Sequence, residues 1–546
     1  MIPLYKKYTS VDFSLPYEKI KNDFSITVPE HFNFTKDVLD VYAKEDSERL
    51  ALIWVNDRDE EKRFTFSQMA LCVNKTANFL LSKGIKKGDC VMLMLRRRYE
   101  FWFFILALHK LGAIACPATY LLTQNEILLR VKNANVKMIV ALNEEDTLLQ
   151  IEKIFPLQNV QFVLANGQRK NWISFEKDFL NQSEVFIDSE NNKNFSSDPM
   201  LVYFTSGTSG LPKMVKHNFA YPLGHIITAK YWQEVEDGGL HLTVAESGWA
   251  KAVWGKLYGA WLCGSAVFVC DTKMIFPEKL LSAIEKYKIT TLCAPPTIYR
   301  YLLLSDLSKH NLSSIKRATV AGEVLSDEVY NEFFKACGIQ LHEAYGQTET
   351  VVLAGNFGNE KIKRPSMGKA SPMFDLHIVD ENEKDCPIGN VGEIVIFPSK
   401  KNMPGIFDGY CNNSELNKKA FNNGVYHTND LAYMDSEGYL FFCGRKDYVI
   451  KTSGFRVSPY EVEAVLLKHE AVFECAVFGI ADQVRGKKIK ALIVLKENYK
   501  ASDSLKKQIM EYLKENLSAY KRPRVLEFTQ SLPKTISGKI KRSALK

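Results

Sequence analysis

Hydrophobic and polar positions follow one rhythm from about residue 65 to residue 345. Short apolar runs rich in β-branched residues alternate there with amphipathic segments of helical length. One unit runs from a strand at 112–117 through a helix at 125–133 to a strand at 137–142, and another pairs a helix at 277–288 with a strand at 289–294. This alternation is typical of parallel βαβ units. We therefore expect an α/β fold with parallel-type sheets.

The rhythm changes beyond residue 370. Short strands at 375–379 and 392–397, separated by Pro and Gly turns, predict a small β-subdomain. The last hundred residues predict a helix–strand–strand–helix–strand series, at 459–468, 472–479, 488–496, 505–517 and 525–528. Such a series can bury a core of its own. We expect a large N-terminal domain (1–446) and a small mobile α+β domain (447–546).

The most apolar stretch, residues 101–118, is interrupted by His109 and Lys110. The remaining runs are too short to cross a bilayer, which favours a buried helix over a membrane span. Arg96, Arg97 and Arg98 precede the stretch, and a run of like charge is more often the solvated start of a helix than a phosphate site.

Composition narrows the class of protein without naming it. The 546 residues are 46% hydrophobic and 25% charged, which is globular and too large for one core. The net charge of +8 is a slight excess on a large surface and does not argue for nucleic acid. The 11 scattered cysteines form no metal-spaced cluster, and no apolar segment follows the first ten residues. We expect a cytoplasmic protein without integral membrane association; the oligomeric state stays open.

A Gly-rich loop, residues 203–213, follows an apolar strand at 200–204. Its glycines permit tight turns, its hydroxyl and N–H groups are donors, and Lys213 adds a positive charge, so the loop is suited to a polyphosphate. The Walker spacing is missing. An ordinary Ser/Thr/Gly turn is the alternative, although this string is longer and more particular than such a turn.

With this loop the chain resembles the acyl-adenylate-forming (AMP-binding) superfamily, which includes acyl-CoA synthetases, peptide-synthetase adenylation domains and firefly luciferase. In that family a T-S-G-T-[ST]-G-x-P-K loop holds the β- and γ-phosphates of ATP, and Thr208 falls at its Mg²⁺-binding position. The resemblance assigns phosphate binding to Thr205, Ser206, Gly207, Thr208, Ser209, Gly210 and Lys213.

Two further motifs, 321–323 and 342–350, follow in the family's order, each just past the end of an expected strand. Open α/β sheets bind ligands at that edge. The resemblance implies that Thr348 contacts the α-phosphate or the substrate carboxylate, and that Glu349 holds Mg²⁺, a cation that prefers carboxylate oxygen. Taken alone, Glu349 would more often be a surface residue. The remaining residues implied at the adenine and nucleotide site are Gly322, Glu323, Glu343, Ala344, Tyr345, Gly346 and Gln347.

A fourth motif pairs Asp430 with Arg445, which by resemblance bind the ribose. The chain departs from the family twice here, because Asn429 stands where Gly is usual and Tyr448 stands where a second acidic residue is usual. Asp447 is the expected hinge.

The tail segment 533–542 carries the fifth motif. By resemblance Lys539 is the catalytic lysine, which bridges the carboxylate and the α-phosphate. Basic tails are normally solvated, and any single lysine in one is rarely catalytic. The resemblance also implies contacts to CoA from Ser453, Gly454, Phe455, Arg456, Arg485 and Lys521, although surface Arg and Lys are commonly just solvated.

Within the superfamily the chain is most similar to the medium-chain acyl-CoA synthetases. Acetyl-CoA synthetases have Trp where this chain has Gly346, so we expect room for a carboxylate larger than acetate. Trp249 matches a position on the pocket wall, with a buried core Trp as an equal alternative.

These motifs predict an ATP-dependent acyl-CoA synthetase that uses Mg²⁺, ATP and CoA on a small-molecule carboxylic acid. Two rival hypotheses stay open. One is an acyl-AMP ligase that loads a carrier protein, and the other is a catalytically silent nucleotide-binding homologue on the same fold. No carrier domain follows Lys539 in this sequence, which favours free CoA.

Overall fold

The structure is a computed structural model of the chain. It describes residues 1–155, 159–205, 212–273, 276–398, 404–452, 455–482, 486–535 and 540–545, without the side chains of 451, 456, 486 and 543. The described residues form two compact units. Unit 1 holds those up to residue 375 together with 398 and 404–419, and unit 2 holds 376–397 and those from residue 420 onward.

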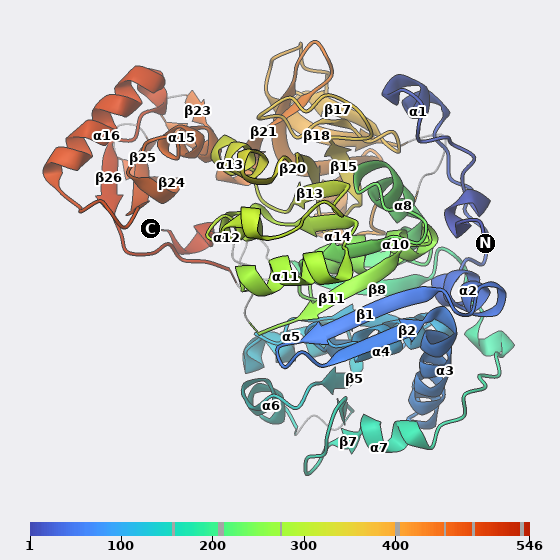
Figure 1. The fold of residues 1–546 in the computed structure, drawn as a ribbon. Helices are drawn as coiled ribbons and strands as arrows, with labels where there is room; N and C mark the ends of the chain where they lie inside the picture. Colours follow the sequence, from blue (N-terminus) through green and yellow to red (C-terminus); the bar gives the residue numbers. More distant parts are fainter. Residues whose placement is uncertain are drawn as a thin grey trace. The chain divides into compact units, whose positions relative to one another are not determined.

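One of the two large sheets of unit 1 has nine strands (Figure 1). Its strands are parallel from β1 to β14 across the middle, while β2 and β15–β16 are antiparallel additions at the edges. The spatial order is β16 (Lys369–Ala370), β15 (Val352–Gly355), β14 (Leu341–Gly346), β13 (Arg317–Ala321), β12 (Thr291–Ala294), β10 (Leu240–Thr243), β11 (Ala266–Asp271), β1 (Leu50–Asn56) and β2 (Glu61–Thr65).

A seven-stranded sheet forms the other half of unit 1. It is parallel except for the hairpin that joins its last two strands. The order is β7 (Ile173–Ser174), β6 (Gln161–Leu164), β5 (Val136–Ala141), β3 (Cys90–Met94), β4 (Ile114–Pro117), β8 (Pro199–Thr205) and β9 (Lys213–Asn218).

Helices separate and cover these sheets. Helix α3 packs on β1 and β2, α4 packs on β3 and β4, and the two helices pack on each other, so they form a layer between the sheets (Figure 1). The helices are α1 (Tyr17–Asp23), α2 (Asp40–Glu45), α3 (Phe66–Ser82), α4 (Glu100–Leu111), α5 (Gln124–Asn133), α6 (Glu145–Glu152), α7 (Phe175–Leu180), α8 (Tyr221–Ile226), α9 (Ala250–Lys256), α10 (Tyr258–Leu262), α11 (Pro277–Tyr287), α12 (Pro296–Leu302), α13 (Asp327–Cys337) and α14 (Ser414–Ala420).

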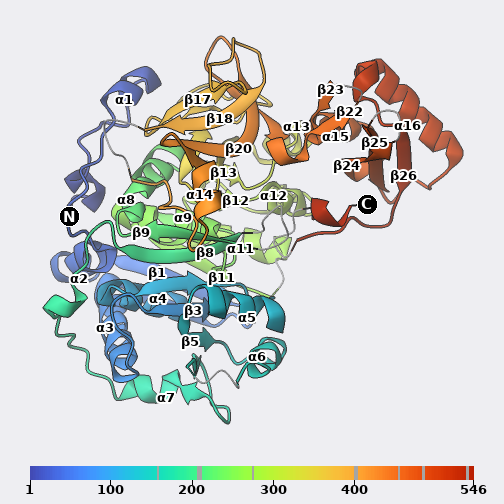
Figure 2. The same ribbon diagram turned by 180° about the vertical axis from the view of Figure 1, so that it is seen from behind.

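Unit 2 contains a five-stranded sheet and a small α+β layer. The α+β layer places α15 and α16 on one face of β24–β26, around a core that includes Val462, Ile493 and Ile509 (Figure 2). The elements are β17 (Asp375–Val379), β18 (Gly392–Phe397), β19 (Phe421–Asn422), β20 (Val425–Met434), β21 (Leu440–Arg445), β22 (Ile450–Thr452), β23 (Phe455–Val457), α15 (Pro459–Leu466), β24 (Val472–Asp482), β25 (Gly486–Leu495), α16 (Asp503–Asn516) and β26 (Val525–Phe528).

The predicted α/β class is confirmed, and the expected strands at 375–379, 392–397 and 525–528 match β17, β18 and β26 residue for residue. The small β-subdomain packs with the C-terminal elements, in unit 2. A hinge at Asp447, between domains 1–446 and 447–546, concerns motion and stays a prediction.

The apolar stretch at 101–118 forms most of α4, whose twelve residues are all buried, and then β4. Two of the polar side chains of α4 have partners inside the fold, since Lys110 pairs with Asp40 (2.9 Å) and His109 Nε2 lies 2.9 Å from the Tyr258 hydroxyl. In the part of the chain that is described, no helix is long and apolar enough to span a bilayer.

The expectation of a solvated arginine run is wrong. Arg96 is 6% exposed and pairs with Glu144 and Asp271, and Arg98 pairs with Glu100. The two carboxylates that pair with Arg96 come from distant parts of the chain, which a local charge pattern does not reveal.

Candidate functional site

The predicted phosphate loop joins two paired strands of the seven-stranded sheet. Thr205 ends β8, Lys213 begins β9, and the two residues face each other in the antiparallel register. The loop members Ser206, Gly207, Thr208, Ser209 and Gly210 lie outside the described residues. The hairpin therefore fixes both ends of the predicted loop at one edge of the sheet.

Lys213, Tyr410 and Glu349 lie together although they are far apart in sequence. The Lys213 ammonium lies 5.1 Å from the centre of the Tyr410 ring, and the Tyr410 hydroxyl donates to Glu349 Oε1 at 2.9 Å. Backbone pairing between Val215 and Tyr410 holds the segment after residue 404 against β9. Tyr410 thus contacts both the Lys213 cation and the Glu349 carboxylate, which belong to two separate predicted motifs.

Thr348 is held from β9 as well. The Nε2 atom of His217 lies 2.8 Å from the Thr348 carbonyl oxygen, and the His217 ring stacks on Tyr221 with centroids 3.9 Å apart. Because a carbonyl only accepts, Nε2 carries the proton in this contact. Burial lowers the pKa of His217 to about 4, so it stays neutral at physiological pH.

In the nine-stranded sheet, Gly322 and Glu323 directly follow β13, the strand that pairs with β14. Gly322 has φ +101°, a conformation that favours glycine, and the Lys251 ammonium donates to the neighbouring Ala321 carbonyl. Glu323 accepts a hydrogen bond from Thr297 at 2.8 Å. Gly322 and Glu323 both lie just past the carboxyl end of β13, as the sequence predicted.

In β14 the predicted residues divide by environment. The Glu343 side chain is buried, pairs with Arg364, and has its pKa raised to about 7 by desolvation. Tyr345 is half-buried at the end of the strand, and the N–H of Gln347 donates to Thr350 at 3.0 Å. The Glu343 carboxylate is therefore part of the scaffold.

The space beside Gly346 is filled from a helix that the motif analysis did not single out. A Cβ atom added to Gly346 would lie 2.5 Å from Trp254 Cη2 and 2.7 Å from the Val351 carbonyl. Trp254 is 5% exposed and belongs to α9, whereas Trp249 precedes α9 and is half-buried. The room expected at Gly346 is therefore bounded by Trp254.

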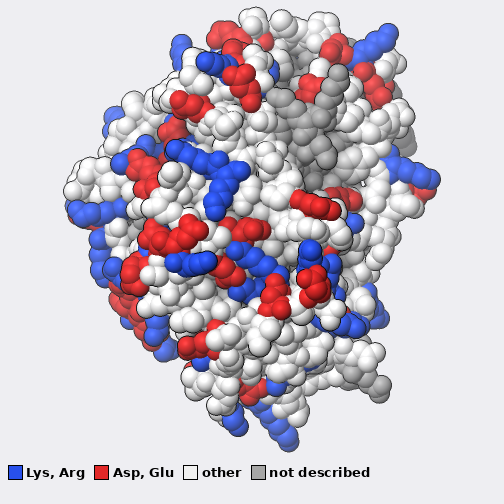
Figure 3. Space-filling view, turned by 90° about the vertical axis from the view of Figure 1, so that its right-hand side faces the viewer, with Lys and Arg blue, Asp and Glu red and all other residues white. Residues whose placement is uncertain are grey.

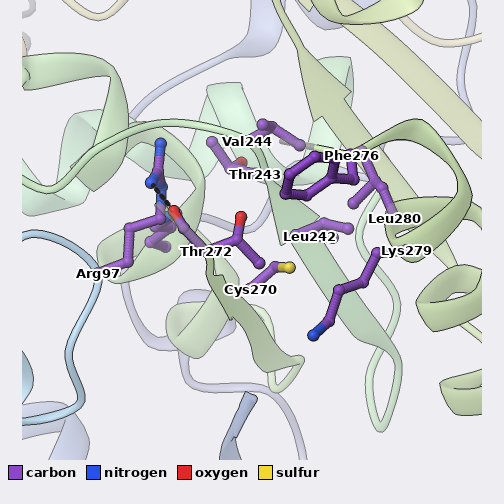
Figure 4. Close-up of a pocket in the computed structure, with 10 residues that line it drawn as sticks. Arg97, Leu242, Thr243, Val244, Cys270, Thr272, Phe276, Lys279 and Leu280 are labelled. Atoms are coloured by element: carbon purple, nitrogen blue, oxygen red, sulfur yellow. Dashed lines mark hydrogen bonds between the residues drawn. The ribbon is translucent and has the colours of Figure 1, made fainter. Parts of the chain in front are cut away.

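A pocket lies at the carboxyl ends of β10 and β11, two parallel strands of the nine-stranded sheet (Figure 4). It is small and partly open to solvent, with about 10 Å³ of enclosed space. Its cations are Arg97, which donates to the Thr272 carbonyl at 3.0 Å, and Lys279, while burial lowers the pKa of the Lys256 ammonium to about 7. Its apolar wall is formed by Leu242, Val244, Phe276 and Leu280. Cations beside an apolar wall suit a ligand with an anionic group and an apolar part.

In unit 2, Asp430 and Arg445 face each other across β20 and β21. Asp430 is buried, and Arg445 Nε lies 3.7 Å from its Oδ1 while Arg445 Nη2 lies 3.7 Å from Asp447 Oδ2. Asn429 has φ +58°, a backbone conformation that Gly adopts freely and Asn tolerates. The exchange of Gly for Asn therefore keeps the left-handed backbone conformation within β20 that directly precedes Asp430.

The predicted CoA residues of unit 2 are described only in part. Phe455 is half exposed and stacks on Tyr520, and Lys521 pairs with Glu461. Ser453, Gly454, Arg485 and Lys539 lie outside the described residues, as does the side chain of Arg456.

Comparison with known proteins assigns the family. The model of the AMP-binding enzyme family matches residues 39–410, and that of the AMP-binding enzyme C-terminal domain matches 461–539. The chain belongs to the AMP-binding enzyme family. The predicted superfamily, its medium-chain acyl-CoA synthetase branch and the class of AMP-forming acid–thiol ligase are confirmed.

Similar relatives include the acyl-coenzyme A synthetase ACSM3, mitochondrial, of Mus musculus, which is 35% identical over 100% of this chain and 95% of its own. The human ACSM4, mitochondrial, is 35% identical over 95% and 91%. Because these relatives are mitochondrial, the predicted cytoplasmic location is wrong. Composition and charge do not distinguish these two compartments.

Solved structures agree with the fold. The anthranilate CoA ligase AuaEII in complex with anthranoyl-AMP has a TM-score of 0.84 at 28% identity, covering 94% of this chain and 96% of its own. The Brucella canis acyl-CoA synthetase has a TM-score of 0.75 at 26% identity, covering 96% and 97%.

His217 generates a prediction about pH. Its pKa is lower in the folded protein than the ordinary 6.5, so the unfolded chain binds more protons below that pH and acid reduces stability. The advantage in unfolding free energy of the wild type over His217→Gln should shrink by about 1.4 kcal/mol per pH unit below 6.5. Urea unfolding of both proteins at pH 7.5, 6 and 5 measures this; a constant difference contradicts it.

Proposed function

We propose that this enzyme joins a carboxylic acid larger than acetate, of the medium-chain, branched or aromatic kind, to CoA through an acyl-adenylate. The carboxylate attacks the α-phosphorus of ATP, the bond to the bridging oxygen breaks, and pyrophosphate leaves. The CoA thiol then attacks the acyl carbon, and AMP leaves. The observation that carries the proposal is the convergence of Lys213, Tyr410 and Glu349 at one edge.

The residues take roles that follow from charge and position. Lys213 faces the phosphates, Asp430 and Arg445 bind the ribose, and Lys539 bridges the carboxylate and the α-phosphate. Thr348 orients the reacting groups from a backbone held by His217. The order of the motifs and the similarity to AuaEII with its bound acyl-adenylate support these roles.

Glu349 is suited to Mg²⁺. In the described part of the chain no three His, Cys, Asp or Glu side chains form a metal cluster. Mg²⁺ characteristically takes one or two carboxylates together with substrate phosphates, and a single glutamate beside a phosphate loop fits that habit. Bound there, it would neutralise charge on the departing pyrophosphate.

Acidic and basic side chains are interspersed on the face shown in Figure 3, which gives a polyanion no continuous positive surface there. The ligands that the carboxyl edge favours are small. CoA combines phosphates with an uncharged pantetheine arm, and we propose that one of its phosphates lies at the open side of the pocket at the ends of β10 and β11, against Arg97 and Lys279.

The first test is a pyrophosphate-release screen over acetate, butyrate, hexanoate and benzoate, with and without CoA, followed by mass spectrometry. We expect release with acids larger than acetate and an acyl-CoA product. A clear preference for acetate contradicts the proposed acid class. A need for a carrier protein in place of CoA, or ATP binding without pyrophosphate release, would establish one of the rival functions.

Trp254 generates a second prediction. Truncating it to Leu enlarges the space beside Gly346, so the ratio of hexanoate to butyrate turnover should rise about tenfold, the scale of a few methylenes in an apolar pocket. Trp172→Leu, in the core of the seven-stranded sheet, is the matched control and should leave the ratio unchanged. An unchanged ratio in Trp254→Leu would place the acyl tail elsewhere.

Tyr410 generates a third. Tyr410→Phe removes the hydrogen bond that orients Glu349, so the Mg²⁺ concentration for half-maximal adenylation should rise about tenfold. Tyr287→Phe is the control, because its hydroxyl also donates to a glutamate, Glu61, away from the site. Equal Mg²⁺ dependence in the two variants would argue against Glu349 as the ligand.

Arg97 generates a fourth. Arg97→Gln should raise the KM for CoA roughly tenfold, the loss of one charge-assisted contact, with ATP–pyrophosphate exchange unchanged. Arg63→Gln, at an exposed ion pair with Glu61, serves as the control. An unaltered KM for CoA would mean that this pocket does not receive it.

A further inference from the structure

The chain on either side of residues 536–539 is tied together within unit 2. Lys534 and Ile540 form an isolated antiparallel bridge, and the Lys541 N–H donates to the Pro533 carbonyl at 2.8 Å. Both ends of the segment that carries Lys539 therefore meet at one place. The contacts of residues 540–542 decide where these two chain ends lie within unit 2.

Arg542 is the anchor. Its Nη1 donates to the Val477 carbonyl at 2.8 Å, and its Nη2 donates to Glu463 Oε2 at 2.6 Å. Glu463 Oε1 in turn accepts the Val477 N–H at 2.6 Å, which closes a ring between the tail, α15 and β24. The side chains of Arg542 and Glu463 are each 8% exposed.

Two aromatic rings also lie near this guanidinium. Its central carbon lies 4.5 Å from the Tyr460 ring centre and 5.5 Å from that of Tyr448. Planar cations stack well on aromatic rings, and an arginine that combines stacking with a two-pronged hydrogen bond has one orientation available. Tyr448 directly follows the expected hinge residue Asp447, so the anchor of the tail also reaches the segment at the hinge.

A buried ion pair of this kind is weak evidence for stability. Replacing both partners by apolar side chains is often neutral, while its directional bonds specify one arrangement. Arg542 stands three residues after Lys539, so the chain between their Cα atoms spans at most about 10 Å.

We propose that Arg542, paired with Glu463, is a positioning residue that sets the reach of Lys539 during adenylation. The inference rests on the proposed role of Lys539. Because that role belongs to the attack on the α-phosphorus, loss of the anchor acts on adenylation and spares the attack of CoA on a preformed adenylate.

Two half-reactions separate positioning from folding. ATP–pyrophosphate exchange with the best acid of the screen measures adenylation, and acyl-CoA formation from a synthetic acyl-adenylate measures the second step. The variants are Arg542→Lys, which keeps the charge but loses the fork, and the double variant Arg542→Met/Glu463→Met, which leaves no unpaired buried charge. Lys539→Ala is the reference, and Arg522→Lys is the matched control because Arg522 binds only the Leu517 and Lys514 carbonyls.

We expect exchange to fall about 100-fold in the double variant, the cost of a misplacement near 1 Å, and less in Arg542→Lys. Thioester formation from the adenylate should stay within twofold in both, and Arg522→Lys should match the wild type. Equal losses in both half-reactions, or none, would overturn the inference while the function stands, provided that Lys539→Ala loses exchange. If Lys539→Ala retains exchange, the proposed role of Lys539 fails and the inference falls with it.

Discussion

Electrostatic repulsion between a carboxylate and a triphosphate is the constraint on which the site depends. Two anions react only where positive charge is held in place before they arrive, because groups that must reorganise lose most of their effect. In unit 1 the Lys213 ammonium contacts the Tyr410 ring, and the hydroxyl of the same tyrosine donates a hydrogen bond to Glu349. These two contacts hold the charged groups in place. One aromatic side chain thereby contacts both a cation and the carboxylate that we propose as the Mg²⁺ ligand.

The scaffold gives these groups little freedom. His217 holds the backbone of Thr348 from a fully buried position, and Arg364 neutralises the buried Glu343 in the adjoining strand. His217 lies on β9, the antiparallel last strand of the seven-stranded sheet, and Glu343 lies on β14, a parallel strand of the nine-stranded sheet. In unit 2 the register of β20 and β21 brings Asp430 and Arg445 opposite each other without any loop to order.

The sequence was informative where local pattern decides structure. Short strands such as 392–397 were located to the residue, because alternation and flanking turns are local signals. The motif residues Lys213, Glu349, Asp430 and Arg445 could be named because the sequence itself gives their residue types and their order along the chain. Their neighbours could not, since Tyr410 meets Lys213 and Glu349, and Trp254 meets Gly346, only through contacts across long sequence separations.

Two expectations show the same limit from the other side. Arg96 was expected to be solvated because its carboxylate partners, Glu144 and Asp271, are distant in sequence. The room expected at Gly346 was inferred from one missing side chain, whereas its extent depends on all the neighbours, and Trp254 bounds it.

The path of one oxygen atom tests the central claim most directly. With the carboxylic acid labelled at both oxygens with ¹⁸O, the account predicts that one labelled oxygen appears in the phosphate of AMP and the other stays in the acyl-CoA carbonyl. This follows because the carboxylate oxygen that attacks the α-phosphorus leaves with AMP. Mass spectrometry of the AMP decides the matter: unlabelled AMP, or label in pyrophosphate, would contradict the acyl-adenylate.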